Sequence, residues 1–387
     1  MTLSHQLRTA VHDTLHHHWV DAGYTAPNDV VYPWQWLWDS CFHALIWHEL
    51  GRTDRALTEL TQALSTQTPG GFVPHMNYQL DPDAHADLWG RSGASSITQP
   101  PMFGHAVAQL VRDGVDVPVP LIDQAEQGLR FLLERRARTP DGLVELCHPW
   151  ESGADNSPRW DDLCPGGFDE ERWRQHKSDL VARIERDADG AAIHNPDFAV
   201  GSIGFNALIA FNARELADGA GRRGVGELAD ALVPAIEQRW RGDGWADAGP
   251  AERSGMVRTA DSMLALLVVS DAGQKQQGWQ MVDDPDGFAA RYGPRGVHGE
   301  EPGYDPQGYW RGPCWPQLAY LLWWGATVQG RAATAASLAE STVAGAEASA
   351  LAEYWNADSG SGLGAIPQSW AGLVLLMDRR AAAAPRA

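Results

Sequence analysis

Cysteine is scarce in this chain, and the few cysteines that occur are not paired in the sequence. The 387 residues include four cysteines, and no two of them form a CxxC motif. Isolated thiols of this kind are typical of a reducing compartment and unlike the dense cysteine spacing of a disulfide scaffold. We therefore expect reduced cysteines and a cytoplasmic protein. The four positions are Cys41, Cys147, Cys164 and Cys314.

Long apolar runs are also missing. No segment approaches the roughly 20 apolar residues that a membrane-spanning helix needs. The N-terminal stretch 1–19 reads as an amphipathic helix, without the apolar core or small-residue cleavage site of a signal peptide. We expect neither a membrane anchor nor a secretory leader.

Basic side chains are outnumbered by acidic ones. Thirty lysines and arginines face 50 aspartates and glutamates, which gives a formal net charge of −20. Such a surface repels nucleic acid and anionic lipid, so we expect neither as a partner. The simplest use of the acidity is solubility. No stretch reads as an interdomain linker, and we predict one domain over residues 1–380, followed by a tail over 381–387.

Several familiar catalytic motifs are absent. The sequence has no HExxH, no P-loop and no glycine-rich dinucleotide-binding turn. Residues 16–18 are three histidines, but adjacent helical positions do not face one point, which argues against a metal site. The glycine–serine pattern around Ser361 lacks the context of a nucleophile elbow. We expect neither a metal nor a cofactor.

A helical period recurs along most of the chain. Leu7, Val11 and Leu15 follow the i, i+4 spacing of one helical face. Thr53 and Asp54 are candidate caps for a helix over 55–65, and Gly51 is a candidate stop for the helix before it. Strand-like alternation is scarce, and about a dozen helices suit an all-α fold, the number that a toroid of six helical hairpins requires. The other predicted helices cover 42–50, 121–138, 205–216, 227–240, 262–270, 315–325, 332–350 and 369–379.

Long loops rich in Gly, Pro and Trp separate these helices. Structureless loops of this length are uncommon unless they are functional or disordered, and their aromatic content argues against disorder. The chain has 18 tryptophans. A large aromatic core is one interpretation, but loop tryptophans on a rigid scaffold suit flat, partly apolar ligands such as sugar rings. The loops cover 23–38, 69–101, 147–168, 293–315 and 354–367.

The segment ESGADNSPRWD, residues 151–161, contains the strongest local signal for chemistry. A carboxyl group held near tryptophan in a partly dry pocket has a raised pKa, as a general acid near neutral pH needs. The alternative is a capped turn whose acidic side chain satisfies backbone donors. The segment EYWNADSGSGLG, residues 353–364, places Glu353 before a glycine-rich loop, and its alternative is a solvated glutamate at a helix end. Both alternatives remain open at this stage.

Two more segments combine aromatic rings with groups that bind hydroxyls. YPWQWLWD spans residues 32–39, and YWRGPCWP spans residues 309–316. Asp39 and Arg311 suit paired hydrogen bonds with sugar hydroxyls. The alternatives are Asp39 as a helix cap and Arg311 as the partner of a carboxylate. Cleavage of a glycosidic bond needs two carboxyl groups, and the sequence offers two candidates on loops far apart in the chain.

Together these segments resemble glycoside hydrolase family 63, in particular its small bacterial glucosylglycerate and mannosylglycerate hydrolases, and more distantly the trehalases. The similar stretches include the QPP of residues 99–101 and the segments just described, and they run along nearly the whole chain. The resemblance implies an all-α (α/α)6 barrel. It also implies an inverting glycosidase acting on a small α-linked glucoside or mannoside, such as glucosylglycerate.

The resemblance also implies roles for individual residues. The aspartate of the ESGxD motif, Asp155, corresponds to the general acid, and Glu353 corresponds to the general base. The aromatic segments build the pocket for the cleaved sugar. The implied lining comprises Tyr32, Trp36, Trp38, Asp39, Gln99, Gly153, Tyr309, Trp310, Arg311 and Trp315.

The chain departs from the family pattern in places. It looks shorter than the hydrolases it resembles, and residues 195–198 and 357–360 differ from the usual family segments. In the glycerate-specific members an arginine after the acid motif binds the glycerate carboxylate, and here Arg172 or Arg174 lies in a comparable stretch. The leaving group and a homo-oligomeric state are therefore left open.

Two rival functions use the same barrel. One is a sugar-binding protein without catalysis, which the presence of both carboxyl groups disfavours. The other is a sugar epimerase, which would lean on paired histidines in the cavity, with His75, His105 and His148 as candidates.

Overall fold

The computed structural model describes residues 5–249 and 256–381, and helices dominate those residues. The predicted tail over 381–387 lies outside the described residues except for Ala381, which ends the last helix. Residues 1–4 of the expected N-terminal helix also lie outside them. Within the described chain, no helix is both long and apolar enough to cross a membrane.

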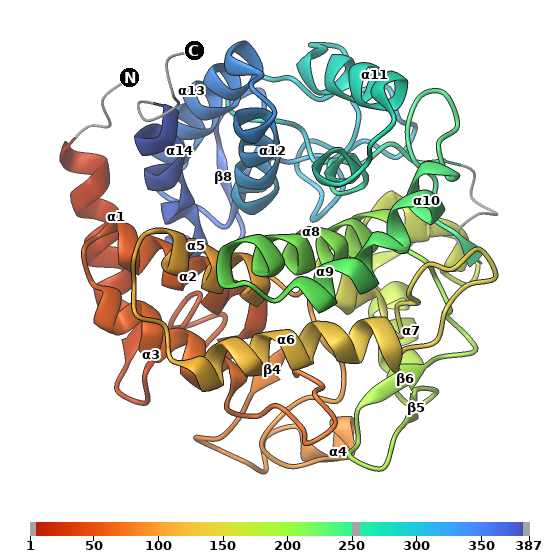
Figure 1. Cartoon of the computed structure of the whole chain (residues 1–387). Helices are drawn as coiled ribbons and strands as arrows, with labels where there is room; N and C mark the ends of the chain where they lie inside the picture. Colours follow the sequence, from red (N-terminus) through yellow and green to blue (C-terminus); the bar gives the residue numbers. More distant parts are fainter. Residues whose placement is uncertain (1–4, 250–255, 382–387) are drawn as a thin grey trace.

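Six helical segments of the described chain form an inner ring. They are apolar on nearly every side, so they are stable only when other helices surround them. Each contacts the next around the ring, and the last contacts the first, which closes it. In order they are α2 (Leu37–Glu49), α5 (Phe103–Arg112), α8 (Ile203–Ala220), η4 (Ser262–Leu267), α12 (Pro316–Val328), and η5 (Ser369–Leu373) continued by α14 (Val374–Ala381). Figure 1 labels α2, α5, α8, α12 and α14 among them.

An outer layer of helices packs around this ring. These helices are mostly amphipathic: α3, for example, buries Ala56, Leu60 and Leu64 on one face and exposes Asp54, Thr58 and Thr61 on the other. The architecture is the predicted (α/α)6 barrel. The outer elements are α1 (His5–His17), α3 (Thr53–Leu64), α6 (Val119–Glu134), α9 (Arg223–Asp230) with α10 (Leu232–Glu237), α11 (Ala272–Asp283) and α13 (Ala332–Ala348).

The connections at the two ends of the barrel differ greatly in length. Those that lead from an inner helix to the next outer helix are short, such as 50–52 and 329–331. Those that lead from an outer helix to the next inner helix are long: 18–36, 65–102, 135–202, 238–261, 284–315 and 349–368. Because the helices alternate in direction around a closed ring, the long connections gather at one end. All five aromatic loops predicted from the sequence belong to this set.

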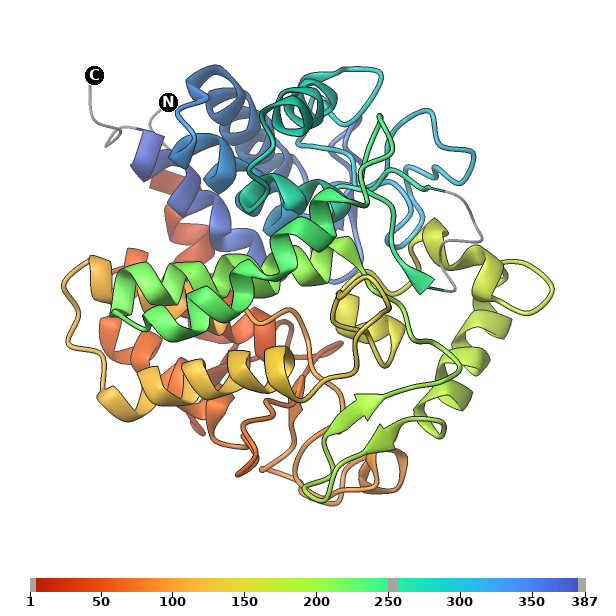
Figure 2. The ribbon, with the colours of Figure 1, turned by 45° about the vertical axis from the view of Figure 1, so that its right-hand side comes forward.

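Short pieces of regular structure stiffen the long connections. Four two-stranded antiparallel sheets lie in them, β1 (Trp19–Val20) with β2 (Tyr24–Thr25), β3 (Gln35–Trp36) with β4 (Met76–Asn77), β5 (Glu185–Arg186) with β6 (Ala192–His194), and β7 (Tyr354–Trp355) with β8 (Gly362–Leu363). Figure 2 shows β5, β6 and the helix α7 on the outside of the barrel. The short helices of these connections are α4 (Ala86–Trp89), η1 (Pro149–Ser152), η2 (Pro158–Leu163) and α7 (Glu170–Val181).

The structure corrects several details of the sequence prediction. Thr53 and Asp54 are the first residues of α3 and not its caps, because Arg52 occupies the N-cap position. The helix predicted over 227–240 is divided into α9 and α10, and the one predicted over 262–270 is the 3-10 helix η4. Helices α5, α7 and α11 were not predicted. Helix α7 is nonetheless capped as expected for a helix start, since the carboxylate of Asp169 accepts a hydrogen bond from the backbone N–H of Arg172 at 3.0 Å.

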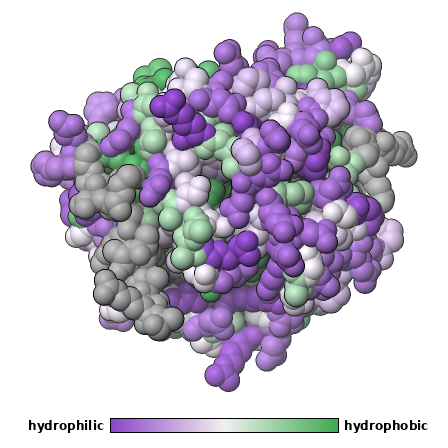
Figure 3. Space-filling view, turned by 90° about the horizontal axis from the view of Figure 1, so that it is seen from above, coloured by the Kyte–Doolittle hydropathy of each residue, from purple (hydrophilic) through white to green (hydrophobic). Residues whose placement is uncertain are grey.

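The surface is mainly hydrophilic on the face seen from above, where apolar side chains form small separate groups (Figure 3). All four cysteines are free and buried.

We predict that Gly104→Ala destabilises the barrel. A Cβ atom at Gly104 in α5 would lie 2.7 Å from the backbone oxygen of Asn212 in α8, so the two inner helices would have to move apart. Overpacking of this kind costs about 1–3 kcal/mol, which urea denaturation measures directly.

The control is Gly224→Ala, on the exposed outer helix α9, where the nearest atom is the flexible end of Arg130. The control should leave stability unchanged or raise it by up to about 1 kcal/mol. Equal effects at both positions would contradict the prediction.

Candidate active site

A cavity of about 420 Å³ opens where the long connections converge. Its wall is mainly aromatic and presents a small number of polar groups, as in sites that bind small molecules. The first turns of inner helices and the connections before them supply the wall, so one end of the barrel builds the whole site. Seven tryptophans contribute, namely Trp34, Trp36, Trp38, Trp89, Trp150, Trp310 and Trp370.

Ten of the twelve residues that the sequence singled out line this cavity. They are Tyr32, Trp36, Trp38, Asp39, Gln99, Gly153, Asp155, Tyr309, Trp310 and Glu353. The other two, Arg311 and Trp315, are not part of the described lining. Trp315 is fully buried behind Trp310, with the two rings stacked 3.6 Å apart between centroids, so it supports the wall from outside the cavity.

Arg311 was expected to bind sugar hydroxyls, and the structure places it elsewhere. Its guanidinium donates two hydrogen bonds to the carboxylate of Asp161, at 2.8 and 2.7 Å. A third hydrogen bond of 3.1 Å reaches the backbone oxygen of Asn156. The alternative weighed for Arg311, pairing with a carboxylate, therefore describes its position. The side chain braces the loop that contains Asp155.

The three acidic side chains of the ESGADNSPRWD segment have different surroundings. Glu151 is fully buried and forms an ion pair with Arg136, while it accepts hydrogen bonds from the backbone N–H groups of Thr98 and Cys147. Asp161 is paired with Arg311. Of the three, only Asp155 lines the cavity. The ion pairs thus leave Asp155 as the acid available for chemistry.

The backbone of the Asp155 loop is held on several sides. Gly153 has a φ of 72°, and a side chain there would collide with the ring of Trp38. Only glycine combines this conformation with this approach. Beyond it, the indole N–H of Trp160 donates to the backbone oxygen of Ala154, and that of Trp173 donates to the backbone oxygen of Asp155, both at 2.8 Å. The carboxyl of Asp155 is therefore presented from a rigid turn.

Glu353 lies at the start of the β7–β8 hairpin and is 2% exposed. One carboxyl oxygen accepts a hydrogen bond from the hydroxyl of Tyr32 at 3.0 Å. The other accepts one from the backbone N–H of Ala365 at 2.9 Å. Its backbone oxygen accepts a bond from the indole of Trp370 at 2.9 Å. Both carboxyl oxygens thus have protein partners other than Asp155.

Burial changes the protonation of both carboxyl groups. It raises the pKa of Asp155 to about 6, against the opposing effect of the Lys177 ammonium group. It raises the pKa of Glu353 to about 7, and the negative charge of Asp155 adds to that effect. Both carboxyl groups therefore exchange protons closer to neutral pH than ordinary acidic side chains do.

Asp39 is the third residue of α2 and also lines the cavity. It is not the cap of that helix, since Trp36 occupies the N-cap position without a side-chain hydrogen bond. Burial raises the pKa of Asp39 well above its usual value, and the charges of Glu353 and Glu59 act in the same direction. A carboxyl in this position can donate or accept a hydrogen bond, according to its protonation.

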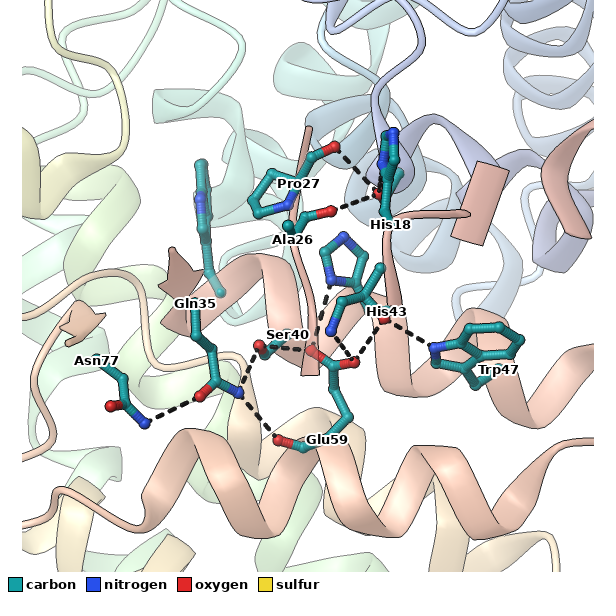
Figure 4. A network of polar contacts seen from close by, with 12 residues as sticks. His18, Ala26, Pro27, Gln35, Ser40, His43, Trp47, Glu59 and Asn77 are labelled. Carbon is teal, nitrogen blue, oxygen red and sulfur yellow. Dashed lines mark hydrogen bonds and ion pairs between the residues drawn. The ribbon is translucent and has the colours of Figure 1, made fainter. Parts of the chain in front are cut away.

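A buried polar network behind the cavity fixes the start of α2 (Figure 4). Its centre is Glu59 of α3, which is fully buried. One carboxylate oxygen accepts bonds from the backbone N–H and the hydroxyl of Thr25, at 2.8 and 2.7 Å, and the other accepts one from the hydroxyl of Ser40 at 2.7 Å. Gln35 donates to Ser40 and to the backbone of Glu59. The network thereby holds the segment that presents Trp36, Trp38 and Asp39 to the cavity.

The histidines considered for an epimerase do not gather in one place. His75 lines the cavity, but burial lowers its pKa to about 3, and its ring is 2.6 Å from the hydroxyl of Ser95. His105 lies between inner helices, bonded to Glu215 and Tyr320. His148 is buried and bonded to the backbone oxygen of Lys177. No pair of these three histidines faces the described cavity.

Sequence reasoning missed part of the site. Arg172 and Arg174, considered for the leaving group, are exposed on α7 and do not belong to the described cavity lining. The same helix turns Trp173 and Lys177 inward, toward the Asp155 loop. A detectable signal existed: Asp169 followed by two glutamates is a helix start, and Trp173, Lys177 and Leu180 then share one face. Tyr78, His85 and Gln368 also line the cavity without having been singled out from the sequence, and His75 lines it although it was considered only for an epimerase.

Comparison with known proteins places these features in context. The model of the mannosylglycerate hydrolase MGH1-like glycoside hydrolase domain matches residues 32–371. A mannosylglycerate hydrolase of Thermus thermophilus is 31% identical, with 91% of this chain and 96% of the relative covered. A glucosylglycerate hydrolase of Mycolicibacterium hassiacum is 27% identical, with 91% and 93% covered.

Solved structures of a mannosylglycerate hydrolase also match this chain. The crystal structure of a family 63 mannosylglycerate hydrolase from Thermus thermophilus, in complex with Tris and D-glycerate, matches with a TM-score of 0.80 and 26% identity, covering 96% of this chain and 99% of that one. The same enzyme in complex with glucose matches with a TM-score of 0.81 and 27% identity, again over 96% and 99%.

We predict that Glu353→Gln stabilises the fold at alkaline pH. The folded pKa of about 7 lies above the ordinary value of 4.5. Ionisation of Glu353 therefore lowers the free energy of unfolding. This loss is complete above about pH 7, and it is absent below about pH 4.5. The Tm of the variant should exceed that of the parent near pH 8, and the gap should close as the pH falls toward 5.

The control is Asp358→Asn, which neutralises an exposed carboxylate of the same hairpin. It should show no stabilisation that grows between pH 5 and pH 8. A gap of constant size for Glu353→Gln would contradict the prediction, because it would show that ionisation is not its source.

Proposed function

The chain belongs to the mannosylglycerate hydrolase MGH1-like members of glycoside hydrolase family 63, and on that basis we propose that it is an inverting α-glycosidase of small glycosides. The protein is a glycoside hydrolase. The proposal adds the mechanism, the two catalytic residues and the substrate. The observation that carries it is that Asp155 and Glu353, nearly 200 positions apart, line the same aromatic cavity with perturbed protonation.

In the proposed reaction Asp155 donates its proton to the glycosidic oxygen as the bond to the anomeric carbon breaks. Glu353 removes a proton from a water molecule, whose oxygen attacks the anomeric carbon from the opposite face. The products are the free alcohol and a sugar of inverted configuration, and the enzyme is left with a proton on Glu353 and a charge on Asp155. Exchange with solvent restores the starting state.

The sugar is proposed to bind by stacking and hydrogen bonding. Trp38 and Trp310 offer ring faces, with centroids 6.4 Å apart and planes inclined by 33°. Asp39 and Gln99 offer polar groups in the same wall. The side-chain oxygen of Gln99 accepts a hydrogen bond from the backbone N–H of Trp38 at 3.3 Å, which directs its amide N–H₂ toward other acceptors.

The substrate is proposed to be an α-glucoside or α-mannoside of a small acid such as glycerate. This rests on the two named relatives and on the glycerate and glucose in the matched crystal structures. The panel that tests this proposal comprises glucosylglycerate, mannosylglycerate, trehalose and short α-gluco-oligosaccharides.

We further propose that residues 1–380 act as one catalytic domain, since contact of η5 with α2 closes the ring. We also propose that the free thiols reflect a cytoplasmic location.

The two pKa values make a specific prediction for the pH profile. The value for Asp155, about 6, is lower than that for Glu353, about 7. A plot of kcat/KM against pH should be bell-shaped, with limbs near pH 6 and 7. A profile that stays flat from pH 5 to 8 would contradict the assignment of this pair.

The roles of the two residues can be separated with two substrates. We expect Asp155→Asn and Glu353→Gln each to retain less than about 1% of activity on the natural type of glycoside, since general acid–base groups contribute about 10²–10⁴-fold. On an α-glycosyl fluoride, whose leaving group needs little protonation, Asp155→Asn should regain activity and Glu353→Gln should not. NMR should show the β-anomer as the first product of the parent enzyme.

The matched controls are Asp162→Asn and Asp358→Asn, which neutralise exposed carboxylates in the same two loops. Both should keep near-parental activity, and circular dichroism should show that all four variants are folded. If Glu353→Gln, and not Asp155→Asn, regained activity on the fluoride, the assignments of general acid and general base would be reversed. An α-anomer as first product, or substantial activity of either catalytic variant on the glycoside, would overturn the proposal.

A further inference from the structure

The helix α7 contains a lysine in an unusual position. Lys177 is one of only two lysines in the sequence, and it is 7% exposed. Its ammonium group donates a hydrogen bond of 2.8 Å to the side-chain oxygen of Asn156, the residue after Asp155. It also lies 5.9 Å from the ring centroids of both Trp150 and Trp173. A buried, rotamer-rich cation is costly to keep, so its position calls for a specific role.

A second residue of the same helix is hydrogen-bonded to the backbone of Asp155. Trp173, one turn before Lys177, donates its indole N–H to the backbone oxygen of Asp155 at 2.8 Å. Residues four apart on a helix project to the same side, so both contacts come from a single face of α7. Arg311 holds the backbone oxygen of Asn156 from the opposite part of the chain. The ammonium group of Lys177 and the guanidinium group of Arg311 thus both bind Asn156, the residue after Asp155.

The positive charge of Lys177 also affects the protonation of Asp155. The ammonium of Lys177 lowers the pKa of that carboxyl, in opposition to burial. Burial lowers the pKa of Lys177, while the carboxylate of Asp155 raises it. The charge of Asp155 also raises the pKa values of Glu353, Tyr32 and Tyr309. The charges of Arg174 and Glu170 have opposite effects on the pKa of Lys177, and the charge of Lys177 lowers the pKa of His148.

We propose that Lys177 is a positioning residue that holds the Asp155 loop in place and stabilises the negative charge left on Asp155 after proton donation. The proposal rests on the proposed role of Asp155 as the general acid. When the proton passes to the leaving oxygen, a carboxylate forms in a poorly solvated wall. A fixed ammonium group nearby lowers the energy of that charge without reorganisation. Lys177 is not among the described residues that line the cavity.

The test compares Lys177→Met, Lys177→Arg and a matched control. Methionine keeps most of the apolar stem and removes the charge, so Asp155 should hold its proton to higher pH. The pH of maximal kcat/KM should rise by about 0.5–1.5 units, half of the ~1–3-unit effect of a close opposite charge on one carboxyl. In addition kcat should fall while KM changes little. Lys177→Arg should restore the parental profile.

The control is Arg183→Met, which removes an exposed cation just beyond the same helix, where it pairs with Asp197. It should leave both the profile and kcat unchanged. An NMR titration of the Asp155 carboxyl carbon in the Glu353→Gln background provides a second measurement that does not need turnover. There the midpoint should rise when Lys177 is replaced by methionine.

The outcomes separate this proposal from the one on which it rests. Substantial activity of Asp155→Asn on the glycoside would overturn the role of the acid and, with it, the role of Lys177. If Asp155→Asn is inactive but Lys177→Met keeps the parental pH profile and the parental titration midpoint, the lysine proposal alone is overturned. A uniform loss of activity with an unchanged profile would show that Lys177 serves only the fold.

Discussion

Closure of the inner ring is the constraint on which the rest of the molecule depends. Six apolar helical segments cannot face water, and they bury their surfaces only when the last of them, η5, packs against the first, α2. Closure places every long connection at one end of the barrel and every short one at the other. The aromatic cavity is thus a consequence of the packing, since residues as distant in sequence as Tyr32 and Trp370 must meet there.

Desolvation at that end of the barrel governs the chemistry of its carboxyl groups. Several acidic side chains lie there, and their partners differ. Glu151 and Asp161 form ion pairs with arginines, and Glu59 accepts three hydrogen bonds, so all three stabilise the fold. Burial raises the pKa of Glu151 in spite of its arginine partner. Asp155 and Glu353 line the cavity without an arginine partner among the residues that the structure describes, and burial raises their pKa values to about 6 and about 7.

The supports of the two reactive groups are unlike each other. Glu353 is held by hydrogen bonds to the carboxyl itself, from Tyr32 and the backbone of Ala365. Asp155 is held through its backbone and through Asn156, which accept hydrogen bonds from α7 and from Arg311. The two carboxyl groups are thus fixed by different kinds of contact.

Local sequence determined much of this protein. Helical periodicity predicted an all-α fold, and the resemblance to glycoside hydrolase family 63 implied the barrel. The motifs at 32–39, 151–161, 309–316 and 353–364 indicated the cavity, because composition and spacing are local properties. The tertiary structure decided which acid of residues 151–161 faces the cavity, that Arg311 and Trp315 stand behind its wall, and that α7 turns Lys177 and not Arg172 or Arg174 toward Asp155. These outcomes depend on which side chains meet across a closed ring, often more than 100 residues apart in sequence. Burial and pairing at such distances exist only once the ring has closed.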